Sequence, residues 1–220
     1  MGRALRRWSL RLLAWGVVAL IWLGIGGAVA LTYVAYTLPP IENVAALQRA
    51  PHMTMIGADG QTFARLGQAG GQPIRVEALP PHVPNAVIAI EDRRFQVHFG
   101  IDPIALTRAF VRNMLAGRVV QGGSTLTQQL AKNLFLTSER TYMRKVQELV
   151  LALWLEFNFS KDDILSAYLN RVYLGAGAYG IDAAARTYFG KPAEALGLAE
   201  AAMIAGLLKA PSRLAPTNDM

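Results

Sequence analysis

The sequence predicts a mostly α-helical domain behind a single N-terminal transmembrane helix. Two observations carry this prediction. Residues 12–37 contain no charge and are almost wholly apolar, which exceeds the roughly 20 apolar residues that span a bilayer core. From Pro84 onwards the apolar residues recur with helical spacing, and strand patterns are scarce.

A cleaved signal peptide is the alternative interpretation of residues 12–37. Signal peptides have a shorter apolar region and a small-residue cleavage site, whereas this run is longer and leads into Tyr36, Pro39 and Pro40. We therefore expect a retained anchor. Four arginines precede the run, and no Lys or Arg follows it before Arg49. The positive-inside rule then makes residues 1–11 a cytoplasmic tail and places the rest of the chain outside.

The amino-acid composition limits which reactions and binding partners are possible for this chain. The chain of 220 residues has no cysteine, so disulfides and thiol chemistry are excluded. Its three histidines are widely spaced and form no ligand motif, and the metal content is unknown from sequence. The net charge of +7 favours anionic lipid headgroups or a phosphate-bearing substrate. Nucleic acid is not expected as a partner of a chain delivered across a membrane.

Residues 38–80 have the composition of a connector, with a β-hairpin signal at Asp59-Gly60. Residues 81–220 form the predicted helical domain, which is long enough for one core. Its seven expected helices fall within residues 84–95, 103–117, 124–136, 138–159, 161–175, 180–190 and 195–208. Asp102-Pro103 and Ser160 are expected to open helices, and Gly117 to end one.

An acidic pair, Glu91-Asp92, follows the first of these helices where it should end. Carboxylates are unfavourable there because the helix dipole is negative at that end. One interpretation is a solvated helix end with Arg93 and Arg94 as partners. The other is a carboxylate held among apolar residues as a general acid or base.

A charged stripe marks the fourth helix. Arg144, Glu148 and Glu156 share one face, with Lys145 adjacent to Glu148. Ordinary i,i+4 ion pairing explains such a stripe on an exposed helix. Here the helix is apolar nearly all round after Glu148, so we predict that the stripe lines a cleft.

The segment "GGSTLTQQLAKN", residues 122–133, is unusually polar for a core helix. Ser124 or Thr125 is predicted as the helix N-cap. Ser124, Gln128 and Lys132 are spaced one turn apart, which predicts a row of hydroxyl, amide and ammonium groups on one face. Such a row at a helix N-terminus suits a sugar or a phosphate. In the next helix, Tyr168 is interpreted as structural.

Four segments, in this order, resemble the motif blocks of the family 51 peptidoglycan glycosyltransferases. They are "EDRRFQVHFG", "GGSTLTQQLAKN", "RKVQELVLALWLE" and "KDDILSAYLNRVYLG". The family comprises the transglycosylase domains of class A penicillin-binding proteins and the monofunctional biosynthetic transglycosylases. The resemblance implies a lysozyme-like, two-lobed fold and an enzyme that polymerises lipid II into β-1,4 glycan strands, with inversion and release of undecaprenyl pyrophosphate.

The resemblance also implies roles for particular residues. Glu91 is expected to be the general base, and Glu148 to assist at the donor site by organising Arg144 and Lys145 or by holding a divalent cation such as Mg²⁺. No other cofactor is expected. The expected substrate-binding residues are Arg108, Ser124, Thr125, Gln128, Gln129, Lys132, Asn133, Arg140, Arg144 and Lys145. Asp92, Phe95 and His98 are expected to support Glu91.

The resemblance leaves several points open. The chain contains neither SxxK nor KTG, and it ends soon after residue 208, where relatives continue. It is therefore either the N-terminal part of a longer protein or a shortened monofunctional relative. A glycan-cleaving lysozyme-like enzyme and a non-catalytic membrane-anchored scaffold are alternatives. The expected partners are lipid II, the nascent glycan chain, the bacterial inner membrane and other cell-wall synthesis proteins.

Overall fold

The computed structural model describes residues 2–38, 52–56, 62–67, 69–136 and 141–216. The chain separates into two compact units, residues 1–40 and residues 41–220, which are described one at a time. Within the first unit, α1 (Gly2–Thr37) is one continuous helix that also includes most of the predicted tail. Its segment Ala14–Val34 is long and apolar enough to cross a membrane, as judged from length and composition.

The second unit begins with a small β structure. Strands β1 (His52–Ile56) and β2 (Thr62–Gly67) pair antiparallel on either side of residues 57–61, which include the predicted hairpin signal. The short strand β3 (Ala69–Gly70) pairs parallel with β4 (Ala178–Tyr179), more than a hundred residues further along the chain. The second half of the predicted connector is thus attached to the helical domain.

Residues 72–79 continue this attachment along α6 (Lys161–Leu169) and α7 (Ile181–Phe189). The Asn170 side chain donates to the Ile74 carbonyl and accepts from the Ile74 amide, at 2.8 and 2.9 Å. The Val76 amide, which begins the short 3₁₀ helix η2 (Val76–Ala78), donates to the Ser166 hydroxyl. These bonds satisfy backbone groups that no regular sheet would otherwise pair.

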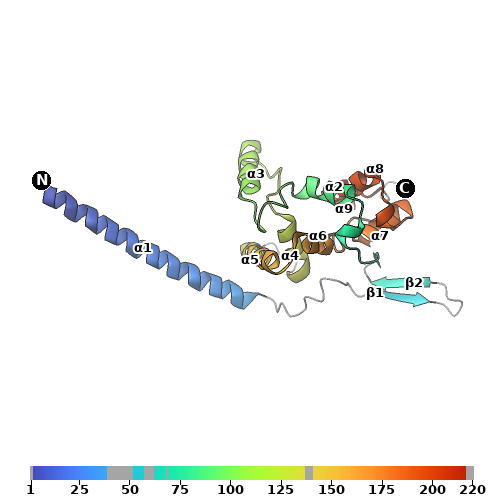
Figure 1. Ribbon diagram of the computed structural model, residues 1–220, viewed down its shortest axis with the longest axis horizontal. Coiled ribbons are helices and arrows are strands. Elements are labelled where there is room, and N and C mark those ends of the chain that lie inside the picture. The colour runs from blue at the N-terminus through green and yellow to red at the C-terminus, as the bar shows by residue number, and fades with distance from the viewer. Residues whose placement is uncertain (1, 39–51, 57–61, 68, 137–140, 217–220) are drawn as a thin grey trace. The chain divides into compact units, whose positions relative to one another are not determined.

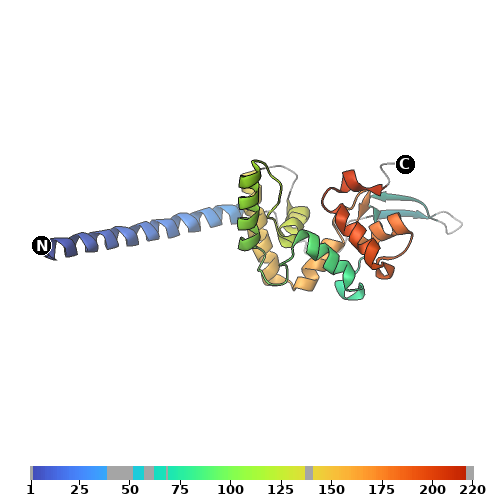
Figure 2. The ribbon, with the colours of Figure 1, turned by 90° about the horizontal axis from the view of Figure 1, so that it is seen from above.

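The rest of the unit is helical, and each of the seven predicted helices is present. The helices are α2 (His82–Glu91), α3 (Pro103–Ala116), α4 (Leu126–Phe135), α5 (Tyr142–Asn158), α6 (Lys161–Leu169), α7 (Ile181–Phe189) and α8 (Leu198–Leu207). A 3₁₀ turn, η3 (Ala193–Ala195), and a short unpredicted helix, α9 (Pro211–Leu214), complete it. Helices α3, α4 and α5 gather on one side of this unit and α7, α8 and α9 on the other (Figures 1 and 2).

Local sequence explains where these helices begin and end. The Asp102 carboxylate accepts the amides of residues 104 and 105 at the start of α3, and Gly117 ends that helix with a φ of 62°. Thr125, rather than Ser124, caps α4. Ser160 and Asp163 form the predicted capping box of α6.

The core fixes the positions of α2 and α4. Leu130 of α4, Leu155 of α5 and Ile164 of α6 are essentially inaccessible to solvent, and α4 packs closely on both neighbours. Helix α2 buries Val83 and Val87 and packs against α8. Truncating a core leucine such as Leu155 to alanine costs about 2–5 kcal/mol. The core thus fixes each helix, and a hydrogen bond from the Leu126 amide to the Asp92 carboxylate, at 3.0 Å, holds the C-terminus of α2 beside the N-terminus of α4.

Candidate functional site

A cleft of about 920 Å³ opens where these two helix ends meet. Its walls are the C-terminal turn of α2, one side of α3, the loop 120–125, Gln129 of α4 and the end of α8. Three carboxylates line it, namely Glu91, Asp92 and Asp102. Their hydrogen-bond and ion-pair partners differ, and these partners decide which of the three carboxylates could act as a general acid or base.

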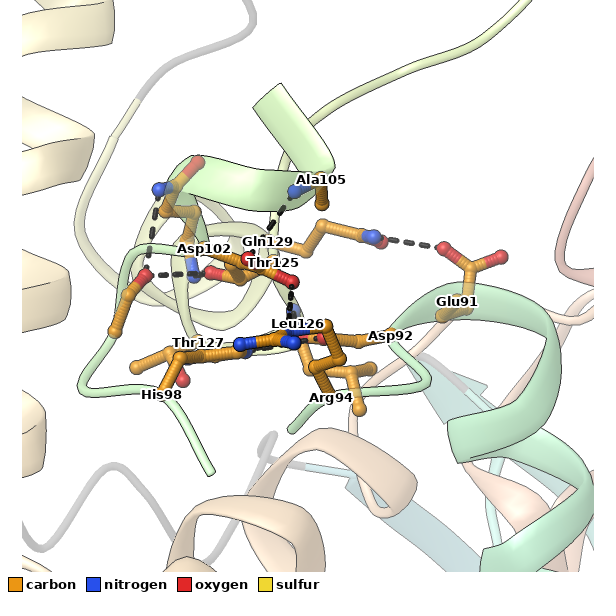
Figure 3. Close-up of polar contacts among 12 residues, drawn as sticks. Glu91, Asp92, Arg94, His98, Asp102, Ala105, Thr125, Leu126, Thr127 and Gln129 are labelled. Atoms are coloured by element: carbon orange, nitrogen blue, oxygen red, sulfur yellow. Dashed lines mark hydrogen bonds and ion pairs between the residues drawn. The ribbon is translucent and has the colours of Figure 1, made fainter. Parts of the chain in front are cut away.

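Glu91 is the last residue of α2 and is half-buried. Its Oε2 accepts a hydrogen bond from Gln129 Nε2 at 2.7 Å (Figure 3). Among the described residues it has no other hydrogen-bond partner and no cation in ion-pair contact. The interpretation that Arg93 pairs with it at a solvated helix end is wrong, because Arg93 instead donates to the Ala89 carbonyl.

Asp92 is buried and fully engaged. Its carboxylate accepts from His98 Nε2 at 2.9–3.0 Å and from the Leu126 amide at 3.0 Å (Figure 3). The second bond places a negative charge at the N-terminus of α4, where the helix dipole favours it. Asp92 therefore ties the end of α2 to the start of α4 and fixes the backbone next to Glu91.

Phe95 and His98 lie in the same buried layer. Phe95 is fully buried, its ring meets the His98 ring edge to face at 6.2 Å, and Lys161 Nζ lies 4.5 Å from its centroid. The residues expected as supports of Glu91 are thus packed together behind it. Asp102, the third carboxylate of the cleft, caps α3 and pairs with Arg94 Nε at 3.1 Å.

Glu148 has a different environment on α5. It is 3% exposed and lies between two cations, with Arg144 Nη1 against Oε1 and Lys145 Nζ 2.6 Å from Oε2. Lys145 Nζ also donates to Ser124 Oγ at 2.8 Å, and Ser124 lines the cleft. Glu148 therefore organises two cations, of which Lys145 is bonded to the cleft wall through Ser124.

Opposing influences act on the pKa of Lys145. Burial lowers its pKa, and the positive charges of Arg144 and Lys132 lower it further. The Glu148 carboxylate opposes this shift by favouring the charged ammonium, but Arg144 shares that carboxylate. The contact with Glu148 thus offsets part of the repulsion that Lys145 meets from the neighbouring cations.

A magnesium site at Glu148 does not fit these residues. Each carboxylate oxygen already contacts a cation, and Mg²⁺ is bound through carboxylates that are free to face it. No group of three or more His, Cys, Asp or Glu side chains able to hold a metal occurs within the described ranges.

The remaining predicted binding residues divide into two sets. Arg108, Ser124, Thr125 and Gln129 line the cleft. Lys132 and Asn133 are exposed on α4 but are not among the residues of the cleft wall, and Arg140 lies outside the described residues.

Two predicted placements are wrong. The polar row on α4 breaks at Gln128, which is 1% exposed and donates to the Gly100 carbonyl at 3.3 Å instead of facing the cleft. Glu156 does not extend the stripe of Glu148 along a cleft. It is buried, and it binds Thr127 at 2.6 Å and Lys161 at 2.8 Å.

The cleft also contains cations that were not predicted from the sequence to bind substrate. Arg93, Arg112 and Lys209 line it together with Arg108. Arg112 lies one helical turn after Arg108, and this spacing is a signal that could have found it. Lys209 follows α8, and only the packing of α8 on α2 brings it to the cleft.

A second cavity, of about 490 Å³, lies among η2, α4, α5 and α6. Its walls are largely core residues such as Leu130 and Leu155. The polar side chains of Ser166 and Asn170 there already bond the backbone of residues 74–76. This cavity offers no reactive group comparable to Glu91.

Comparison with known proteins identifies the family of the chain. A family model described as Transglycosylase matches residues 59–220. The chain belongs to the transglycosylase family. This is the peptidoglycan glycosyltransferase family that the four motif blocks resemble.

Three relatives, each named Penicillin-binding protein 1A, illustrate the match. The protein of Aquifex aeolicus (strain VF5) is 52% identical over 159 residues, which cover 72% of this chain and 22% of that protein. The proteins of Escherichia coli (strain K12) and Pseudomonas aeruginosa are 43% and 42% identical over 92% and 94% of this chain, and 24% and 25% of their own length. The chain thus spans about a quarter of the relatives that it matches.

Proposed function

We propose that this chain is a peptidoglycan glycosyltransferase that polymerises lipid II into β-1,4 glycan strands, with inversion and release of undecaprenyl pyrophosphate. One observation carries the proposal. Among the described residues, Glu91 is the only carboxylate of the cleft wall without a cation or a backbone amide as partner, and it shares that wall with four cations. A lone base among positive charges suits a reaction with an anionic leaving group.

In this mechanism Glu91 acts as the general base. Its carboxylate removes the proton from the 4-hydroxyl of the acceptor GlcNAc while that oxygen attacks C1 of the donor MurNAc. The bond between C1 and the pyrophosphate oxygen breaks, and the pair of electrons leaves with the pyrophosphate. Attack from the face opposite the leaving group inverts C1.

Cations take the place of a general acid in this reaction. Arg108 on the cleft wall, with Lys132 and the pair Arg144–Lys145, would neutralise the charge that develops on the pyrophosphate. A glycan-cleaving enzyme would instead need a second carboxyl group to act beside Glu91. Asp92 and Asp102 are already committed to structural partners, which disfavours that alternative.

The finer description of the fold belongs to the same proposal. We regard the helical unit as lysozyme-like, with one lobe built on α3, α4 and α5 and the other on α7, α8 and α9. Glu91 and the cleft then lie between these lobes. Two contacts support this division: α2 packs against α8, and Asp92 accepts a hydrogen bond from the Leu126 amide of α4.

Membrane association completes the proposal. The apolar helix α1 would cross the inner membrane with residues 1–11 in the cytoplasm, so that the helical domain lies outside the cytoplasm. Helix α3 and the residues after it also expose large apolar side chains, with Phe110 66%, Leu115 80% and Val119 84% exposed. Apolar side chains interleaved with Arg108 and Arg112 suit a surface that meets the headgroups of lipid-linked substrates.

The direct test is polymerisation of purified lipid II by the detergent-solubilised chain. We expect long glycan strands from the wild type and from Asp162→Asn, which neutralises an exposed carboxylate on α6, and none from Glu91→Gln. A folded wild type that makes no strands would contradict the synthase function. Strands from Glu91→Gln as well would leave synthesis in place and remove Glu91 as its base.

A further inference from the structure

Two hydrogen bonds in series connect Glu91 with the interior of the domain. Tyr168 of α6 donates its hydroxyl to Gln129 Oε1 at 3.3 Å, and Gln129 Nε2 donates to Glu91 Oε2 at 2.7 Å. The series joins helices α6, α4 and α2. Tyr168 is 1% exposed and is absent from the cleft wall, so it does not meet a ligand there.

The direction of both bonds follows from their two ends. Ionised Glu91 can only accept, so the amide must present its NH₂ group to it and its carbonyl to Tyr168. Burial and the negative charge of Glu91 raise the pKa of Tyr168 well above its usual range. The tyrosine hydroxyl therefore keeps its proton and remains able to donate.

We propose that Gln129 and Tyr168 are positioning residues that hold the Glu91 carboxylate in place, bind its ionised form more strongly than its protonated form, and remain hydrogen-bonded to it after it gains a proton. The proposal rests on the glycosyltransferase function, in which Glu91 gains a proton in each catalytic cycle. It also gives Tyr168, for which the sequence favoured a structural over a catalytic role, a part in the reaction.

The second protonation state requires only a rotation of the Gln129 amide. Once Glu91 has taken the acceptor proton, its carboxyl group becomes a donor. The amide can then turn by 180° so that Oε1 accepts from Glu91 and Nε2 donates to the Tyr168 oxygen. A hydroxyl serves at this end because it both donates and accepts, whereas a backbone amide or carbonyl would favour one orientation alone.

Other ionisable groups also face this part of the cleft. They are Asp92, Arg93, Asp102, Arg108, Arg112 and Lys209. Asp92 and Asp102 have partners of their own, and none of the four cations is in ion-pair contact with Glu91 among the described residues. The variants at Gln129 and Tyr168 leave these groups in place, so a change in the titration of Glu91 reports on the two hydrogen bonds.

The test compares Gln129→Met and Tyr168→Phe with the wild-type chain in detergent. Gln129→Met removes the donor to Glu91, so we expect kcat for lipid II polymerisation to fall by about tenfold with little change in KM. The acid limb of the pH–rate profile should move to higher pH by about half to one unit, because ionised Glu91 loses a donor. Tyr168→Phe should lower kcat by only about threefold, because its hydrogen bond to Gln129 is long. The acid limb should move in the same direction as in Gln129→Met, but by less.

Tyr188→Phe is the matched control. It also removes a tyrosine hydroxyl, which donates to the Leu174 carbonyl at 2.8 Å, but has no link to Glu91. We expect unchanged kcat and an unchanged acid limb. Equal kinetics for Tyr168→Phe and Tyr188→Phe would overturn the proposal, as would a raised KM for Gln129→Met, which would indicate direct substrate binding.

A readout without substrate separates this proposal from the proposed function. The Glu91 carboxyl can be titrated by ¹³C NMR of labelled glutamate in the full chain, with Glu91→Gln to assign its signal. We expect its titration midpoint to rise in Gln129→Met and, less, in Tyr168→Phe. An unmoved midpoint would refute the positioning roles of Gln129 and Tyr168 whether or not lipid II is polymerised. A wild type that makes no strands would refute the glycosyltransferase function alone.

Discussion

Glu91 and Glu148 are both shielded glutamates of one helical domain, yet their partners differ in charge. Glu91 receives a hydrogen bond from the neutral amide of Gln129. Glu148 lies between the cations of Arg144 and Lys145. A carboxylate held by two cations is stabilised as an anion and has little tendency to take a proton. A carboxylate held by one neutral amide is kept in place but is still able to accept a proton.

The comparison separates two uses of the same side chain. At Glu91 the domain supplies geometry, through the fixed backbone of Asp92 and the amide of Gln129, and leaves the acid–base chemistry to the carboxylate. At Glu148 the carboxylate holds Arg144 and Lys145 in position, and these two cations are the groups proposed to neutralise the pyrophosphate. Variants at each site should therefore fail in different kinetic parameters.

The largest expected effect comes from moving the Glu91 carboxylate while keeping its charge. In Glu91→Asp the side chain is one methylene shorter, so the carboxylate withdraws from Gln129. A displacement of about 1 Å costs on the order of 100-fold in rate, and we expect kcat for lipid II polymerisation to fall by about that factor. Steady-state kinetics measures it. Near-normal kcat would show that a negative charge in the cleft suffices without precise placement.

A smaller effect is expected when Glu148 loses its charge. In Glu148→Gln the side chains of Arg144 and Lys145, which are 19% and 44% exposed, lose their shared anion. We expect kcat/KM to fall by about 10- to 100-fold, chiefly through KM, and the free energy of unfolding to fall by about 1–3 kcal/mol. Kinetics and thermal unfolding in detergent test both.

Glu156→Gln is the matched control for this prediction. Glu156 is also a buried glutamate on α5 with a lysine partner, but it bonds Lys161 and Thr127 away from the cleft. We expect similar destabilisation with an unchanged KM. If both variants raised KM equally, general loosening of α5 would explain the result, and Glu148 would have no specific role.

The helices and the location of Glu91 were accessible from sequence because local signals determine them. Periodic apolar residues and caps such as Asp102 and Ser160 mark the helices. Glu91-Asp92 stands out because acidic residues are unfavourable where a helix ends. These signals lie within a few residues of the feature that they predict, so no tertiary information is needed.

The partners across the fold were not accessible in the same way. Gln128 and Gln129 are adjacent and chemically identical, but they point about 100° apart on α4. Only the packing of α4 on Gly100 and α2 decides that Gln128 is buried and Gln129 meets Glu91. Glu156 likewise bonds Thr127 and Lys161, which belong to other helices, and no pattern within α5 reveals these partners.

The pH dependence should differ between the two glutamate sites. Burial, Arg144 and Lys132 lower the pKa of Lys145, so its ammonium loses the proton at a lower pH than an ordinary lysine. Binding of the pyrophosphate should therefore weaken on the alkaline side. Lys132→Gln removes one repelling charge, and we expect the alkaline limb of kcat/KM to move up by a few tenths of a pH unit. Arg118→Gln, on the exposed loop after α3, should leave the limb unmoved.

The smallest expected effect distinguishes two adjacent hydroxyls. Ser124 accepts from Lys145 Nζ at 2.8 Å, and Lys145 keeps Glu148 when that bond is lost. Ser124→Ala should therefore lower kcat/KM by about 2- to 10-fold, the equivalent of about 0.5–1.5 kcal/mol, with little change in stability. Thr125 instead caps α4 and donates to the Gly100 carbonyl at 2.7 Å. Thr125→Ala should cost about 0.5–2 kcal/mol of unfolding free energy. Equal losses of stability in the two variants would contradict the assignment of Ser124 to the cations of Glu148.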